Sequence, residues 1–188
     1  MTERMDEQEL IRRVQNNGDE VAFSEILTAY KDRIVNYLYQ FTGDYQKAVE
    51  LSQETFLRVF FKAGQYRPVA PLSSWIYAIA SNLAKTEMKK ARRVPLISLD
   101  ELASHEVRSR AYAEDRPDSG MLKNLRQALD ELRPRYRIPV ILKDMEGFSQ
   151  EEIARILRQP VGTIKARISR GRGILRKKLA KADGRKPA

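Results

Sequence analysis

Apolar residues recur three and four positions apart along most of this chain, and this periodicity is the strongest constraint on its fold. Four segments carry such a stripe: 24–41, 45–61, 75–93 and 121–179. No segment shows the strict alternation that is typical of a half-buried β-strand. Gly43 separates the first two stripes, and Ser73 or Ser74 is positioned to cap the third. The pattern predicts an all-α fold.

Residues 94–120 interrupt the helical pattern. They mix charged and small residues, include Pro95, Pro117 and Gly120, and carry no sustained apolar stripe. Prolines and glycines at this density are typical of connecting segments. The sequence therefore predicts two small helical domains joined by a flexible linker and followed by a short basic tail. In order, these parts are domain 1–93, linker 94–120, domain 121–182 and tail 183–188.

The positive charge is concentrated in two separate segments. Of the formal net charge of +10, residues 61–93 carry +6 and residues 161–188 carry +9, so the rest of the chain is slightly acidic. Clustered Lys and Arg attract a phosphate backbone and release counterions on binding. A solvated surface is the alternative for either cluster alone. Two such clusters favour a nucleic-acid-binding protein with two contact regions.

Composition excludes several classes of function. The chain has no cysteine and a single histidine, His105, which leaves no disulfide framework, thiolate nucleophile or His-based metal site. It contains no GxxxxGK[ST] phosphate-binding loop. No apolar run reaches the ~18 residues of a membrane span, and the first ten residues do not resemble a signal peptide. We therefore expect a cytoplasmic, non-enzymatic protein without a cofactor or metal.

The most specific local signal lies between Phe148 and Leu179. Ser149 and Glu152 form an S-x-x-E capping box that starts a short helix, and Pro160 marks the turn after it. The buried side of this helix is predicted to comprise Ile153, Ala154, Ile156 and Leu157. The stripe of the longer helix that follows comprises Val161, Ile164, Ile168, Gly171, Leu175 and Leu179. A short helix, a turn and a longer basic helix together indicate a helix-turn-helix.

The face opposite that stripe suits a major groove. Ala166 is small enough for close approach, while Ser169 and Arg170 can reach base edges. Lys165 and Arg167 flank this face. Further basic residues, predicted to meet phosphates, are Arg172, Arg176, Lys177 and Lys178. The alternative is a helical hairpin with a solvated basic face.

At these residues the chain resembles a known family. The segment EGFSQEEIARILRQPVGTIKARISRGRGILRKKL is similar to the promoter −35-binding region of bacterial extracytoplasmic-function (ECF) sigma factors. Pro134 stands where that family turns between helices, whereas Pro139 inside the next helix is a departure. The resemblance implies that −35 DNA is bound by Thr163, Lys165, Ala166, Arg167, Ser169, Arg170, Arg172 and Arg176.

The helix expected at 45–61 has apolar residues on two opposite sides. Four residues point towards the domain core: Ala48, Leu51, Thr55 and Val59. Leu57 and Phe61 point the other way, among acidic and amide side chains, so this helix is either central in a core or covered by a partner. AVELSQETFLRVF resembles the family's segment that docks on core RNA polymerase, although Val49 replaces a common acid. The resemblance implies a polymerase-binding surface made of Glu50, Gln53, Glu54, Leu57 and Phe61.

The next helix and the loop before it resemble the family's −10 element reader. On SSWIYAIASNLAKTEMKKARR, one side is expected to carry Trp75, Ile76, Ile79, Ala80 and Leu83, and the other Ala78, Ser81, Asn82, Lys85 and Lys89. Ala78 replaces a usual Arg and Thr86 a typical Asp. The Pro-rich loop before it is implied to capture an extruded base. The implied −10 residues are Tyr66, Arg67, Ser73, Ser74, Trp75, Asn82, Lys85 and Lys89.

The resemblance covers most of residues 20–93 and 121–180. It implies a region 2-like domain and a region 4-like domain of a sigma factor that binds core RNA polymerase, directs it to −10 and −35 promoter elements and promotes DNA opening. Its implied partners are core RNA polymerase, double-stranded −35 and single-stranded −10 promoter DNA, and an anti-sigma factor, with the chain itself outside the membrane. The alternative is a free-standing helix-turn-helix regulator, which would need a dimerisation surface or sensor domain.

Overall fold

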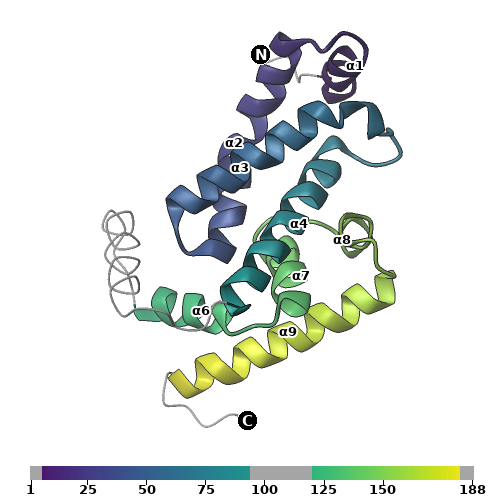
Figure 1. Cartoon of the computed structure of the whole chain (residues 1–188). Coiled ribbons are helices and arrows are strands. Elements are labelled where there is room, and N and C mark those ends of the chain that lie inside the picture. Colours follow the sequence, from purple (N-terminus) through teal and green to yellow (C-terminus); the bar gives the residue numbers. More distant parts are fainter. Residues whose placement is uncertain (1–5, 94–119, 183–188) are drawn as a thin grey trace, which may run out of the picture.

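The computed structural model describes residues 6–93 and 120–182, and within these ranges it contains helices and no strand (Figure 1). The N-terminal half comprises α1 (Glu7–Asn17), α2 (Glu20–Thr42), α3 (Tyr45–Phe61), the 3₁₀ helix η1 (Ala63–Gln65) and α4 (Leu72–Arg93). The C-terminal half comprises α6 (Gly120–Asp130), α7 (Pro134–Asp144), α8 (Gln150–Leu157) and α9 (Val161–Ala182). The all-α prediction is confirmed. The predicted linker up to residue 119, with His105, and the tail at 183–188 lie outside the described residues.

Helix α1 is the main element that the sequence analysis missed. Asp6 caps it by accepting a hydrogen bond from the backbone N–H of Gln8, and Gly18 ends it in a left-handed conformation. Its buried face consists of only Leu10, Ile11 and Val14. A stripe of three residues is a weak periodic signal, whereas the aspartate before it and the glycine after it are the boundary signals that would have located this helix.

Two helices begin earlier than predicted. Helix α2 starts at Glu20 rather than Ser24, because the Asp19 side chain accepts from the Ala22 N–H at 3.0 Å. Helix α4 starts at Leu72, so the predicted cap at Ser73 or Ser74 is wrong. Leu72 is buried, and the Ser74 amide donates to the Pro71 carbonyl at 3.0 Å. Ser73 and Ser74 therefore lie within the first turn of α4, after the buried Leu72.

The capping box of α8 is confirmed in both directions. The Ser149 hydroxyl accepts from the Glu152 N–H at 3.2 Å, and the Glu152 carboxylate accepts from the Ser149 N–H at 2.8 Å. The turn that follows is made by Arg158, which adopts a left-handed conformation with φ 50°. Pro160 lies in the connection between α8 and α9, as predicted, and its carbonyl accepts the first hydrogen bond of α9, from the Ile164 N–H.

A glycine lets α9 cross close to α7. A Cβ atom added at Gly171 would lie 2.6 Å from Cγ2 of Val140 and 3.4 Å from the Tyr136 carbonyl oxygen. Pro134, expected at a turn between helices, is the first residue of α7 and directly follows that turn, and Pro139 lies buried within the helix. The predicted stripe of α9 is buried at Ile164, Ile168, Gly171 and Leu175, whereas Val161 is exposed and Leu179 half-buried.

The two halves of the described chain pack against each other along α4, which contacts α7 and α8 (Figure 1). The Tyr77 ring lies edge-on to Phe148 with centroids 4.8 Å apart, and the Tyr77 hydroxyl donates to the Glu146 carboxylate. Arg137 of α7 donates to the Gln40 carbonyl at the end of α2 and stacks 5.5 Å from the Phe41 ring. The halves therefore share buried contacts. No helix in the described residues is long and apolar enough to span a membrane.

Candidate nucleic-acid and partner surfaces

The outer face of α9 presents the side chains that the sequence assigned to duplex DNA. Lys165, Ala166, Ser169 and Arg170 are all exposed on this helix, opposite its buried stripe. Exposed Lys165 and Arg170 have no carboxylate within 4.0 Å among the described residues. A cationic helix face with a small residue at its centre can approach a major groove and contact both base edges and phosphates.

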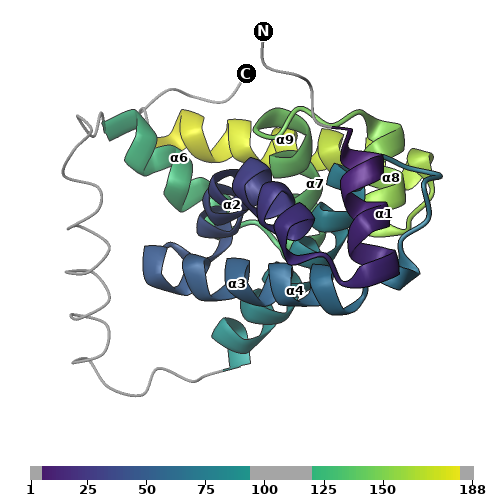
Figure 2. The same ribbon diagram turned by 90° about the horizontal axis from the view of Figure 1, so that it is seen from above.

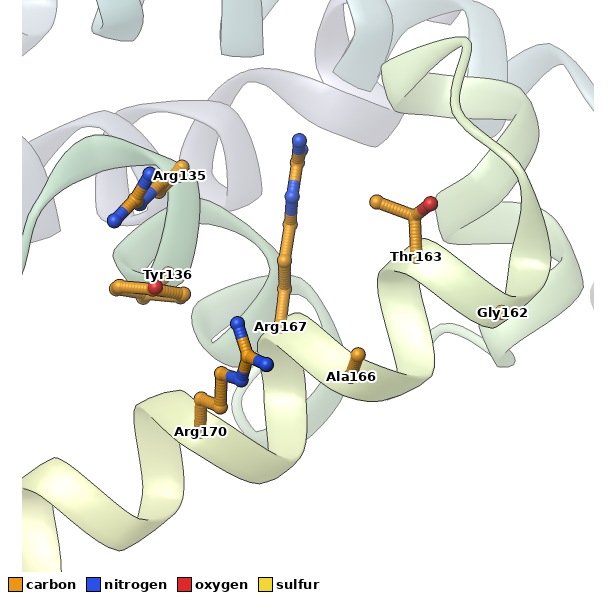
Figure 3. Close-up of a pocket in the computed structure, with 7 residues that line it drawn as sticks. All are labelled: Arg135, Tyr136, Gly162, Thr163, Ala166, Arg167 and Arg170. Carbon is orange, nitrogen blue, oxygen red and sulfur yellow. The ribbon is translucent and has the colours of Figure 1, made fainter.

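Beside this face the surface is hollowed between α7 and α9. The hollow has a volume of about 350 Å³ and is lined by Arg135, Tyr136, Gly162, Thr163, Ala166, Arg167 and Arg170. Figure 3 shows Arg135 and Tyr136 on α7, across the hollow from Arg167 and Arg170 of α9. The Arg135 guanidinium lies 4.7 Å from the Tyr136 ring centroid. Arg135 was not predicted as a site residue, because nothing in the local sequence pattern of α7 indicates that its first turn faces α9.

Three other predicted −35 residues differ in their surroundings. Arg172 forms an ion pair with Asp144, with Nε 3.0 Å from Oδ2, and this hydrogen bond raises the pKa of Arg172. Arg167 is half-buried and donates weakly to the Gln159 side chain at 3.4 Å. Arg176 is exposed. Arg172 would therefore exchange an existing carboxylate partner for a phosphate, whereas Arg176 has no such competitor among the described ion pairs.

The predicted −10 face of α4 is partly exposed and partly buried. Asn82, Lys85 and Lys89 are exposed. Ser81 was expected beside them but is buried, because its hydroxyl shares a 2.7 Å hydrogen bond with the Tyr37 hydroxyl of α2. Ser81 can thus face the core, because the buried Tyr37 hydroxyl supplies the hydrogen bond that its own hydroxyl needs.

The loop before α4 is held by several hydrogen bonds. Tyr66 is buried, its hydroxyl donates to the Ala70 carbonyl at 2.8 Å, and its ring lies 5.4 Å from the Trp75 ring. Ser74 is buried, while Ser73 and Trp75 are half-buried. Arg67 is exposed, and Val69 at the loop tip is 87% exposed. The buried Tyr66 therefore ties the loop to the core, and the exposed surface of the loop comes from the residues between Tyr66 and Ser74.

A second pocket lies between the two halves and brings residues of both predicted DNA faces together. Its volume is about 200 Å³. From α4 it is lined by Ser81, Asn82 and Lys85, and from the C-terminal half by Pro134, Arg135, Ile138, Pro139, Leu157, Gln159 and Arg167. Its charged lining residues are all cationic. This contact could not be predicted from the sequence, because it depends on how the two halves pack.

The predicted partner surface on α3 is exposed as expected. Leu57 and Phe61 are 53% and 79% exposed, and both lie on the side facing away from the buried Leu51, Thr55 and Val59. Around them, Glu50 and Gln53 are exposed and Glu54 is half-buried. Glu50 pairs with Lys47 at 2.9 Å and Glu54 with Arg58 at 2.7 Å. In Figure 2 this helix lies on the opposite side of the molecule from α9, so the acidic–apolar surface is separate from the basic one.

Both halves of the chain match models of a known protein family. The family model described as Sigma-70 region 2 matches residues 26–94, and that described as Sigma-70, region 4 matches residues 122–175. The chain is 36% identical over 172 residues to the ECF RNA polymerase sigma factor SigW of Bacillus subtilis, covering 86% of this chain and 91% of SigW. It is also 36% identical over 173 residues to the ECF RNA polymerase sigma factor SigE of Mycolicibacterium smegmatis, covering 87% of this chain and 65% of that longer protein.

Solved structures share the fold at lower identity. The structure of CnrH in complex with the cytosolic domain of CnrY matches with a TM-score of 0.69 at 20% identity, covering 94% of this chain and 98% of CnrH. The Bartonella quintana sigma factor RpoE, solved in complex with the anti-sigma factor NepR, matches with a TM-score of 0.63 at 24% identity over 86% of this chain and 98% of RpoE. At these identities the likeness is one of fold.

Proposed function

The chain belongs to the ECF family of RNA polymerase sigma factors, and from that premise we propose which surfaces bind polymerase and promoter DNA. It binds core RNA polymerase, directs the enzyme to −10 and −35 promoter elements and promotes DNA opening. The observation that carries this is the presence, in one chain and in family order, of a region 2 match on α2–α4 and a region 4 match ending in a helix-turn-helix. We infer that it performs no bond chemistry of its own and works in the cytoplasm, where RNA polymerase acts.

For the −35 element, we propose that α9 enters the major groove. The exposed Lys165, Ser169 and Arg170 support base and phosphate contacts around Ala166. Thr163 and Arg167 line the adjoining hollow with Arg135, while Arg172 and Arg176 extend the cationic face along the helix. The domain made of residues 121–182 is therefore the proposed −35 reader.

For the −10 element, we propose that the loop before α4 and the exposed side of α4 bind the separated strand. Arg67 and the exposed loop tip are the accessible parts of the loop, and Asn82, Lys85 and Lys89 continue from it along α4. Tyr66, Ser73, Ser74 and Trp75 shape the loop from its buried side. The domain made of residues 1–93 is the proposed −10 reader.

The packing of the two halves has a consequence for DNA binding. Asn82 and Lys85 share a pocket of about 200 Å³ with Arg167, and a DNA duplex is far wider than this space. These three side chains therefore cannot all meet DNA in the arrangement seen in this structure. We infer that the two halves move apart when promoter DNA binds and stay connected by the predicted linker at 94–120.

The acidic–apolar surface of α3 is the proposed docking site for core polymerase. Leu57 and Phe61 supply an exposed apolar centre, and Glu50, Gln53 and Glu54 surround it with groups suited to a basic partner. An anti-sigma factor that competes for the same surface is a further proposed partner.

Reconstitution with core RNA polymerase tests the proposal. The wild-type chain should bind core enzyme and support run-off transcription from promoters located by start-site mapping after overexpression. Phe61→Ser should weaken core binding by about tenfold or more, as expected for an interface centre. Val21→Ser, which replaces another exposed apolar side chain, is the matched control. A wild-type chain that binds DNA but neither binds core enzyme nor supports initiation would favour a free-standing regulator.

Separate variants test the DNA faces. Arg170→Ala should lower −35 duplex affinity and leave core binding unchanged, because Arg170 lies on α9, away from α3 (Figure 2). Arg155→Ala, an exposed arginine on α8, is the matched control. Equal losses in both variants would indicate general electrostatic attraction rather than a specific α9 face.

A further inference from the structure

Helix α1 contacts the loop that the proposed function assigns to the −10 strand, and one side chain makes the polar part of that contact. The Gln15 side-chain nitrogen donates to the Ala63 carbonyl at 2.9 Å and to the Tyr66 carbonyl at 3.1 Å. These carbonyls lie at the two ends of the 3₁₀ turn that leads out of α3. Because one amide nitrogen donates to both carbonyls, Gln15 links the start and the end of this turn.

We propose that Gln15 is a positioning residue for DNA opening: it holds the loop between η1 and α4 in the shape that receives the extruded −10 base. The inference rests on the proposed function. Gln15 lies outside the residues matched by either family model, 26–94 and 122–175, and the local sequence pattern gave it no role. It acts through the loop backbone, with no contact to DNA required of its own side chain.

The position of Gln15 is itself fixed by the packing of α1. Leu10, Ile11 and Val14 are buried, and the Tyr30 hydroxyl of α2 donates to the Glu7 carboxylate at 2.7 Å. These contacts anchor α1 on the rest of the N-terminal half. Gln15 is half-buried at the end of the helix that lies beside η1. Its amide is therefore presented to the loop by a helix that is packed on the rest of the N-terminal half.

The hydrogen bonds continue from the carbonyls that Gln15 holds into the loop itself. The Tyr66 carbonyl also accepts from Arg67 at 3.1 Å, and Arg67 donates to the Gly64 carbonyl at 2.8 Å. The Tyr66 hydroxyl donates to the Ala70 carbonyl at 2.8 Å, which ties the far side of the loop tip back to the buried ring. Displacement of the Tyr66 backbone would thus move both Arg67 and the segment up to Ala70.

A loop that captures a base benefits from being fixed beforehand. A flexible loop loses conformational entropy when it is ordered by binding. A loop that hydrogen bonds already hold in place lost this entropy on folding, so its ordering does not weaken binding. Each hydrogen bond between Gln15 and the loop is expected to change an equilibrium by about two- to tenfold. Loss of both should therefore reduce strand capture several-fold, while leaving the α3 and α9 surfaces as they are.

The test uses Gln15→Met in the full chain, assembled with core RNA polymerase. Methionine matches glutamine in length and flexibility but has no N–H to donate. Gln8→Met, an exposed glutamine on the same helix, is the matched control. The rate of open-complex formation is followed by fluorescence of 2-aminopurine in the −10 strand, on a duplex promoter and on one with a mismatched, already open −10 region.

Gln15→Met should slow opening on the duplex promoter by about fivefold or more, with a clearly smaller effect on the mismatched promoter. Core binding and −35 duplex affinity should remain within twofold of those of Gln8→Met. Opening at the rate of Gln8→Met, or an equal loss on both promoters, would overturn the proposal. Failure of the wild-type holoenzyme to initiate at all would instead overturn the proposed function, and this inference with it.

Hydrogen exchange separates positioning from simple destabilisation. In the Gln15→Met chain, the hydrogen-bonded backbone amides of Gln65 and Tyr66, where the loop begins, should exchange faster, while those of α1 and α2 keep wild-type protection. Unchanged exchange in the loop would overturn the proposal. Faster exchange in both α1 and the loop would also overturn it, because Gln15 would then serve the stability of α1 rather than the position of the loop.

Discussion

Replacement of Gly171 by alanine tests whether the close crossing of α7 and α9 is what requires a glycine there. The added Cβ would lie 2.6 Å from Cγ2 of Val140, against 3.4–4 Å for an ordinary contact. Val140 is buried and β-branched, so it has few alternative rotamers with which to move aside. Overpacking of this kind costs about 1–3 kcal/mol.

Helix propensity acts in the opposite direction. Alanine is favoured over glycine within a helix by about 1 kcal/mol. The net destabilisation expected for Gly171→Ala is therefore about 0–2 kcal/mol. Gly173 supplies the control two positions along the same helix, because a Cβ there meets nothing within 4 Å. Gly173→Ala should be neutral or stabilising by up to about 1 kcal/mol.

Thermal and urea unfolding of the full chain measure the difference. A destabilisation of 1 kcal/mol corresponds to a Tm decrease of roughly 2–4 °C at this chain length. Gly171→Ala combined with Val140→Ala should be less destabilised than the sum of the two single variants, since removing the valine methyls relieves the overlap. If Gly171→Ala raised Tm as much as Gly173→Ala, the crossing would not depend on glycine, and the packing argument would be refuted.

Three further predictions follow from single contacts. Ser149→Ala should destabilise the chain by about 1 kcal/mol through loss of the α8 cap, whereas Ser169→Ala on the exposed face of α9 should change the free energy of unfolding little. Burial raises the pKa of Glu146 above its ordinary value of 4.5. The folded state therefore holds this proton more tightly than the unfolded state, and the stability of the wild type falls as pH rises from the ordinary pKa through the raised one. The stability of Glu146→Gln relative to wild type should therefore increase from pH 4 to pH 7 in thermal scans, and a constant difference would contradict this. Because the chain has no cysteine, Arg33→Cys and Glu146→Cys, on either side of Tyr77, can be joined specifically by a reducible bismaleimide. The cross-linked protein should lose promoter binding and regain it when the linker is reduced. Unimpaired binding of the cross-linked protein would show that the halves need not separate.

The elements with strong local signals were predictable. The bounds of α3 were predicted as 45–61 and are confirmed, since Asp44 and Gly43 punctuate the chain before it and a long apolar stripe fills it. The angle of Leu57 and Phe61 to the buried stripe left open whether they lie in a core, and the structure shows both side chains exposed. The capping box at Ser149 could be read directly, because both of its hydrogen bonds join residues only three positions apart. The functional assignment of individual DNA-contacting residues stays a prediction.

Other features depend on contacts between residues far apart in sequence. The burial of Ser81 requires the Tyr37 hydroxyl, 44 residues away, and the role inferred for Gln15 requires carbonyls 48 and 51 residues away. The contact of Tyr77 with Glu146 spans 69 residues and joins halves that the sequence alone presented as separate domains. Helical periodicity reports which face of a helix is apolar, but it does not report what covers that face.

The sequence by itself determined the all-α class, most helices and the location of the basic and acidic surfaces, because these follow from the spacing and charge of neighbouring residues. Tertiary structure alone decided which polar side chains are buried, how closely α9 approaches α7 and that α4 lies against α7 and α8. These outcomes depend on the shape and hydrogen-bonding groups of distant partners, which local spacing does not encode.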